Sequence, residues 1–342
     1  MGKITLVPLN AEARRFEKAN KVLEKYLNIA DRNELREMSS DILWLETPLN
    51  TRKKAFATHK KTISALRPLF KQYVIELNKV AKKDGYKNRI EFINQYHKIS
   101  KEKYELFLEK ADDVTKILNQ KFPEPPAEWA DWYWSKYNTP DALRLATKKE
   151  YVVPDDIIKM IKKKTPKVAA LLPKIEIETR KGFLSSALYD KKRKKVIIST
   201  PLQKTDLRGA LVFIHEISHA VVDFDCVEKG IDPLSKSKYW GEKETHRVAS
   251  SLIKKLFSKK IHEAWLASFL DGFSRAFFEY EIYNHSERNF DRAFARANNR
   301  CYLKANQYEN PFYVIKSYLV SRAGHSAMAS VAITELLLEG KI

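Results

Sequence analysis

Residues 213–220 read Phe-Ile-His-Glu-Ile-Ser-His-Ala, with two histidines four residues apart and a glutamate directly after the first. On an α-helix, residues i and i+4 lie on one face, so His215 and His219 can offer ring nitrogens to the same Zn²⁺. Glu216 then stands where a carboxylate can act as general base on a water molecule. The spacing therefore predicts a helix that carries a catalytic zinc site. The alternative is a pair of hydrogen-bonded histidines in an ordinary core helix.

The residues before this stretch predict the setting that such a helix needs. Lys195–Thr200 is rich in β-branched residues and is followed by Pro201, so we expect a strand there. Thr205 or Asp206 can cap the N-terminus of the helix that follows. The apolar residues of that helix are dense enough to bury it: Leu207, Ala210, Leu211, Phe213, Ile214, Ile217, Ala220, Val221 and Phe224.

A catalytic zinc needs a third protein ligand and an open position for water. The candidates are Glu242 and Glu244, at the start of a second predicted helix that begins near Tyr239. At about 100° per residue, Glu242 lies about 50° from the centre of that helix's apolar face, and Glu244 lies about 110° away. We therefore predict Glu242 as the ligand and Glu244 as a solvated charge. The apolar face consists of Val248, Ala249, Leu252 and Leu256.

Two further polar residues share the faces of the predicted ligands. His246 follows Glu242 by four residues, and Asp223 follows His219 by four. Each could orient a ligand through a hydrogen bond, since such contacts set the position and tautomer of metal ligands. The alternative for both is an ordinary satisfied polar residue.

The motif is the zincin signature, and the chain resembles the M3 family of zinc metallopeptidases, the thimet oligopeptidase and oligoendopeptidase F group. The similarity covers roughly residues 60 to 335, and the zinc motif is its one sharp element. The other similar segments are Asn78–Tyr86, Trp129–Tyr137, Gly182–Ser199, Phe277–Tyr283 and Asn310–Tyr313. A second gluzincin group, the ImmA/IrrE-like regulators, resembles only the middle third of the chain.

The M3 resemblance implies a gluzincin fold with a small edge β-sheet and helical lobes around a deep channel. It also implies that Tyr313 or Tyr318 donates a hydrogen bond to the developing oxyanion. The chain departs from the family pattern at Ser218, where glycine is usual, and at Val222, where histidine is usual. The C-terminal segment around the two tyrosines has no histidine, so the donor set there is only partly present.

Length and composition predict a mostly α protein with a large core. The chain has 342 residues, 44% of them hydrophobic, and strand-like segments are confined to roughly residues 175 to 200. A proline-rich break at 122–126 suggests an N-terminal helical lobe over 1–122 and a zincin region with a C-terminal helical lobe over 123–342. The absence of a long apolar run and the presence of only two cysteines predict a cytoplasmic protein.

The formal net charge of +20 raises the question of an acidic partner. The densest basic runs are 162–164 and 191–195, and neither lies among aromatic residues or in a nucleic-acid motif. We interpret them as solvated surface, with 191–195 as the turn before the edge strand, where lysines would favour acidic peptides. The expected partner is therefore a peptide rather than nucleic acid or a membrane. The sequence does not predict whether the protein is a monomer or an oligomer.

Together these features predict a zinc-dependent endopeptidase for short, unstructured peptides. His215, His219 and Glu242 would hold Zn²⁺, and Glu216 would take a proton from water and pass it to the leaving amine. Two alternatives stay open. One is an ImmA/IrrE-like protease that cuts a folded regulator. The other is a non-catalytic zincin-fold module that binds an acidic partner or nucleic acid through its basic surface.

Overall fold

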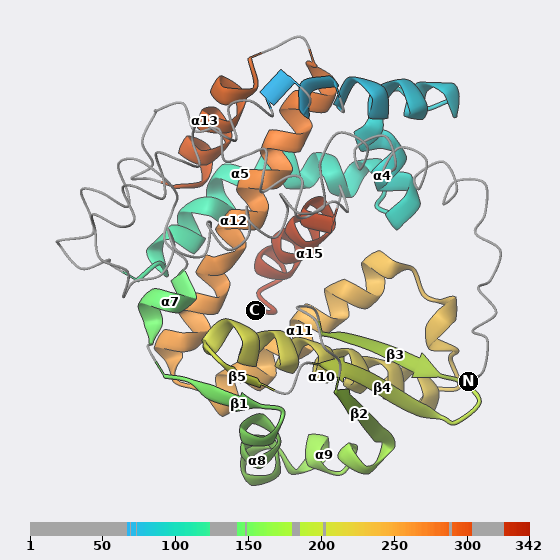
Figure 1. Ribbon diagram of the computed structural model, residues 1–342, viewed down its shortest axis with the longest axis vertical. Helices are drawn as coiled ribbons and strands as arrows, with labels where there is room; N and C mark the ends of the chain where they lie inside the picture. The colour runs from blue at the N-terminus through green and yellow to red at the C-terminus, as the bar shows by residue number, and fades with distance from the viewer. Residues whose placement is uncertain are drawn as a thin grey trace. The chain divides into compact units, whose positions relative to one another are not determined.

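The structure is a computed structural model that describes residues 67–123, 142–179, 185–200, 203–286, 289–302 and 325–342, apart from positions 69, 73 and 148. These residues are mostly helical and also form two small sheets (Figure 1). The predicted fold class, mostly α with a small β-sheet, is confirmed. In the parts of the chain that are described, no helix is both long enough and apolar enough to cross a membrane.

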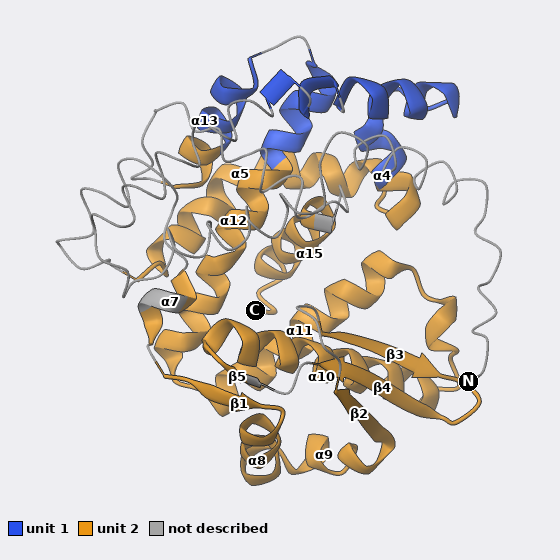
Figure 2. Ribbon diagram, in the orientation of Figure 1, with its two compact units in different colours: residues 1–93, 277–297, 307–323 blue, residues 94–276, 298–306, 324–342 orange. Residues whose placement is uncertain are grey.

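The chain divides into two compact units, each built from separate stretches of sequence (Figure 2). Unit 1 comprises residues 1–93, 277–297 and 307–323, and unit 2 comprises residues 94–276, 298–306 and 324–342. Unit 2 contains the predicted zinc-site residues. The predicted boundary between an N-terminal lobe (1–122) and a zincin region (123–342) stays a prediction.

A three-stranded sheet in unit 2 has the order β2-β4-β3. In it, β2 (Ile175–Thr179) runs parallel to β4 (Lys195–Thr200), and β3 (Ser186–Asp190) runs antiparallel to β4. A second sheet pairs β1 (Tyr151–Val153) with β5 (Gln203–Thr205). Val196 and Ile198 of β4 are completely buried, which agrees with the β-branched strand predicted at 195–200.

Two predictions about the strands are wrong. The strand that we expected at the edge, β4, is the middle strand, because β2 pairs with it on the side away from β3. Residues 191–194 do form a turn, but it joins β3 to β4, and β3 is an edge. Strands also occur outside residues 175–200, namely β1 and β5. Each has three residues, too few to show a strand pattern in the sequence, and the two strands pair with each other.

Helix α10 (Leu207–Glu228) carries the two histidines and packs against β3, β4 and α11 (Figure 1). Asp206 is the N-cap, and its carboxylate accepts a hydrogen bond from the Gly209 N–H at 3.1 Å. A Cβ on Gly209 would lie 2.1 Å from Thr205 Oγ1, so glycine lets β5 run directly into the helix. All the predicted apolar positions are buried except Val221, which is half-buried.

Three further helices of unit 2 are α11 (Lys238–Leu256), α5 (Lys101–Gln120) and α15 (His325–Leu338). Ser237 caps α11, and its hydroxyl accepts a hydrogen bond from Trp240 N–H at 3.1 Å. Helix α11 packs against α10 and against α15, and α15 also packs against α5. Of the predicted apolar face of α11, Ala249, Leu252 and Leu256 are buried, whereas Val248 is half-buried.

The remaining elements are α4 (Arg89–His97), α7 (Ala142–Ala146), α8 (Asp155–Lys164), α9 (Pro166–Ala169), η2 (Leu172–Lys174), η3 (Pro233–Ser235), α12 (Lys259–Asn284) and α13 (Phe290–Cys301). Among these elements, α4, α12 and α13 each have residues in both units. Within unit 1, Phe278 contacts Phe294 edge-on with ring centroids 5.4 Å apart. Asn78 Nδ2 donates to the backbone oxygen of Tyr283 at 2.9 Å, which ties the first stretch of this unit to the second.

Candidate metal centre

The three predicted ligands lie together where α10 and α11 meet. His215 Nε2 and His219 Nε2 are 3.2 Å apart. Glu242 Oε2 lies 3.4 Å from His215 Nε2, and Glu242 Oε1 lies 3.7 Å from His219 Nε2. One ligand atom from each residue can be chosen so that all three lie within 4.8 Å of one another. Two imidazole nitrogens and a carboxylate oxygen therefore converge on one point.

The two candidate glutamates of α11 have different surroundings, and the choice between them as metal ligand stays a prediction. The Glu242 side chain is 12% exposed and faces both histidines. The Glu244 side chain is 22% exposed and accepts a hydrogen bond from Arg247 Nε at 2.7 Å. Glu244 is thus the partner of an arginine one turn along the helix, and Glu242 is the carboxylate available to a metal.

The charges of this group suit a divalent cation. Burial alone would raise the pKa of Glu242, but its hydrogen bond to His215 and the charges of the neighbouring histidines hold that pKa well below its usual range. Glu242 is therefore ionised. Two histidines and one carboxylate, with one position left for water, are the ligand set of catalytic zinc in proteins. The residues present thus fit a zinc ion.

His219 is held from its other side by a residue that sequence analysis missed. Thr245 Oγ1 lies 2.9 Å from His219 Nδ1, and the Thr245 side chain is fully buried. Hydrogen bonds to the second ring nitrogen fix the tautomer and orientation of a ligating histidine. The sequence feature that could have indicated this role is that Thr245 follows Glu242 by three residues and so lies on the same side of α11.

His246 and Asp223, the two residues that we considered for orienting a ligand, stay predictions for that role. The His246 ring is buried, with its centroid 5.0 Å from the His215 ring and 5.2 Å from the Phe269 ring. It therefore supports His215 by packing. Asp223 is half-buried on α10, and burial raises its pKa to about 6.

Glu216, the predicted general base, is a buried carboxylate. Burial raises its pKa; the charge of His215 opposes the rise and that of Glu242 adds to it. The backbone N–H of Ala187 also interacts with Glu216 and lowers the pKa. Since Ala187 belongs to β3, an edge strand lies directly beside this carboxylate.

The predicted oxyanion donors Tyr313 and Tyr318 lie outside the described residues, as does the Trp129–Tyr137 segment. Their roles stay predictions.

Comparison with known proteins gives the fold a context. No family profile matches the chain, and neither does any curated protein sequence. Among solved structures, PZ peptidase A with an inhibitor matches with a TM-score of 0.60 and 14% identity over 94% of this chain. A protein described as an oligoendopeptidase F from Bacillus anthracis strain Ames matches with a TM-score of 0.56 and 16% identity over 92% of this chain.

The chain has the fold of these peptidases. Another oligoendopeptidase F structure, from crystals grown by microfluidic seeding, matches with a TM-score of 0.58, 11% identity and 94% coverage of this chain. In each comparison the match covers 64% of the longer solved chain. The peptidase fold implied by the M3 resemblance is thus confirmed at the level of architecture.

Proposed function

We propose that this protein is a zinc-dependent endopeptidase of the M3 type that hydrolyses short, unstructured peptides. The observation that carries the proposal is the convergence of His215, His219 and Glu242, with Glu216 next to the first ligand. The fold of the neighbouring peptidases supports it, because this constellation lies on a scaffold shared with enzymes of that class.

In this mechanism His215, His219 and Glu242 would hold the metal. Bound zinc would polarise the scissile carbonyl and lower the pKa of the attacking water toward neutrality. Glu216 accepts a proton from that water and later donates it to the leaving amine. A pKa raised by burial suits a carboxyl group that must both take up and release a proton. Thr245 keeps the His219 ring in the orientation that ligation requires.

The edge strand β3 is the proposed place for the substrate backbone. Exposed strand edges bind extended peptides through main-chain hydrogen bonds. Ala187 of β3 lies beside Glu216, and Leu188 is 63% exposed. A peptide paired with this strand would therefore present its carbonyl groups near the general base. Tyr313 or Tyr318 is proposed as the oxyanion donor, a role worth about 3 kcal/mol in comparable enzymes.

We further propose that the protein acts in the cytoplasm. Cys226 and Cys301 are free and buried, which is consistent with a reducing compartment.

The test combines metal analysis with peptide digestion. The purified protein should carry one zinc per chain and cleave internally quenched peptides, while leaving folded proteins intact. His215→Ala and His219→Ala should each lose most of the zinc and the activity, since each removes one of three protein ligands. Full zinc occupancy in either variant would refute the metal site. Cleavage of a folded protein with no activity on short peptides would refute the substrate class.

A further inference from the structure

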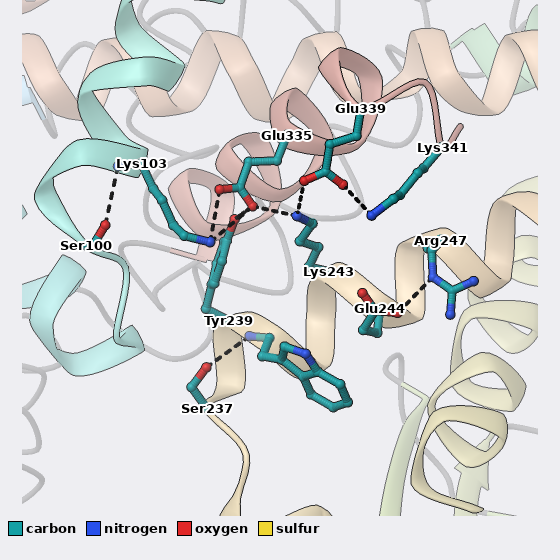
Figure 3. Close-up of polar contacts among 11 residues, drawn as sticks. Ser100, Lys103, Ser237, Tyr239, Lys243, Glu244, Arg247, Glu335, Glu339 and Lys341 are labelled. Atoms are coloured by element: carbon teal, nitrogen blue, oxygen red, sulfur yellow. Dashed lines mark hydrogen bonds and ion pairs between the residues drawn. The ribbon is translucent and has the colours of Figure 1, made fainter. Parts of the chain in front are cut away.

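Glu335 of α15 is a buried carboxylate that accepts hydrogen bonds from three donors on two other helices (Figure 3). Tyr239 Oη donates to Glu335 Oε2 at 2.5 Å, and Lys243 Nζ lies 2.8 Å from the same oxygen. Lys103 Nζ of α5 lies 2.9 Å from Glu335 Oε1. We call Glu335, Tyr239, Lys243 and Lys103, together with Glu339, the Glu335 cluster.

The cluster contacts α11 at the turn that carries the third metal ligand. Tyr239 and Lys243 are four residues apart, so they lie on one face of α11, and both reach Glu335. Glu242 directly precedes Lys243 and is turned from it by about 100°, toward α10. Because the Glu335 carboxylate binds Tyr239 and Lys243 on successive turns of α11, it restricts rotation of α11 about its own axis. That rotation sets where Glu242 points.

The charges in the cluster are matched, so its geometry is strongly specified. Lys243 is nearly buried and lies between Glu335 and Glu339, the latter at 2.7 Å. Lys341 in turn lies 2.8 Å from Glu339. Burial would raise the pKa of Glu335, but hydrogen bonds from Lys243, Tyr239 and Lys103 lower it, so the carboxylate is ionised. Removing the Glu335 carboxylate would leave the buried Tyr239 hydroxyl without this acceptor and Lys243 with Glu339 as its remaining ion-pair partner, which favours a local rearrangement of α11.

We propose that Glu335 is a positioning residue for Glu242, which holds the N-terminal half of α11 in the rotation that directs Glu242 at His215 and His219. The inference rests on the proposed metal site. Through Glu335, α15 would affect metal affinity without contacting the metal.

The test is a double-mutant cycle on zinc affinity, measured on metal-stripped protein by competition for Zn²⁺ with chelators of graded strength. Glu335→Ala should weaken zinc binding about 10-fold, the lower end of the range seen when a group that contacts a metal ligand directly is lost, because Glu335 acts on Glu242 only through the helix. In a Glu242→Ala background the same change should weaken it less than about 3-fold, because the residue on which Glu335 acts is gone. A long-range charge effect of Glu335 would instead persist in that background.

Thr334→Ala is the matched control. Thr334 is the buried neighbour of Glu335 on α15, and its hydroxyl donates to Ser330 O of its own helix at 2.8 Å. This variant should lower the melting temperature of the metal-free protein without changing zinc affinity. If Glu335→Ala does not fold, Glu335→Gln takes its place, since it keeps the shape and an acceptor for Tyr239 but loses both lysine ion pairs.

The outcomes separate the inference from the proposed function. Equal losses in the two backgrounds, or an equal loss in Thr334→Ala, would overturn the positioning role. Normal zinc affinity in a folded Glu335 variant, with weakened affinity in Glu242→Ala, would overturn the inference alone. A parent protein that binds no zinc would overturn both.

Discussion

Thr245 Oγ1 and His219 Nδ1 lie 2.9 Å apart, which ties α11 to the ring of the second predicted ligand on α10. The other nitrogen of that ring, Nε2, faces Glu242 Oε1 at 3.7 Å. One turn of α11 therefore supplies both a candidate metal ligand and the hydroxyl that orients a histidine. The two contacts depend on the same packing of α10 against α11.

Replacing Thr245 with valine should weaken zinc binding by about 10- to 100-fold, because valine keeps the side-chain shape but cannot hydrogen-bond the imidazole. Thr245→Ser should restore most of the affinity. The measurement is zinc competition with a chelator, and Ser218→Ala is the control, since the Ser218 hydroxyl donates to the backbone oxygen of Ile214 on its own helix. Equal affinity in Thr245→Val and the parent would contradict the orienting role.

The two glutamates of α11 should differ sharply in their effect on metal binding. Glu242→Ala removes a carboxylate that lies beside both histidines, whereas Glu244→Ala removes the partner of Arg247 at the surface. We expect a large loss of zinc affinity in the first variant. In the second, metal content should stay at the parent level and stability should change by less than about 1 kcal/mol. The reverse order would show that the helical phase was misassigned.

Glu216→Gln should separate catalysis from metal binding. Glutamine has nearly the same size but cannot accept the proton, so peptide cleavage should fall by about 10²-fold or more while zinc stays near one per chain. Quenched-peptide kinetics and metal analysis on the same preparation check both parts. Glu244→Gln, which makes the same chemical change outside the site, should cleave at the parent rate. Parent-like cleavage by Glu216→Gln would sink the proposed mechanism.

Asp223 should make the protein less stable at neutral pH than at acidic pH. Its pKa is about 6 in the folded chain against an ordinary value of 3.8, because burial disfavours the charged form. The folded state therefore binds the proton more tightly, and this contribution to stability falls as the pH rises from about 4 to about 6.

Asp223→Asn should then stabilise the metal-free protein by on the order of 1 to 2 kcal/mol above pH 7, allowing for solvent screening, and by almost nothing below pH 4. Denaturant unfolding of parent and variant at the two pH values measures the difference. Asp225→Asn is the control on the same helix, because Asp225 is exposed and paired with Lys229 at 2.6 Å. A gain in stability that is the same at both pH values would argue against titration of Asp223.

Much of the candidate site could be predicted from the sequence because its geometry is set within single helices. The spacing of His215 and His219 places them on one face wherever α10 lies, and Asp206 caps that helix by accepting from the N–H of Gly209, three residues later. The choice of Glu242 over Glu244 follows from the period of α11 and from the apolar residues on its inner face. Both relationships lie within single helices, so helical periodicity is enough to predict them.

Contacts between separate elements were decided only by the tertiary structure. The strand at Lys195–Thr200 was predicted, but its place in the middle of the sheet depends on β2, whose residues pair with those 21 positions later in the chain, such as Ile175 with Val196. Thr245 and His219 are 26 residues apart, and Tyr239 and Glu335 are 96 apart. Sequence periodicity describes which face of a helix is apolar, but not which residue of another helix meets a given polar group. The partner depends on how the helices pack. A buried polar group needs a hydrogen-bond partner, and packing decides which residue lies within hydrogen-bond distance.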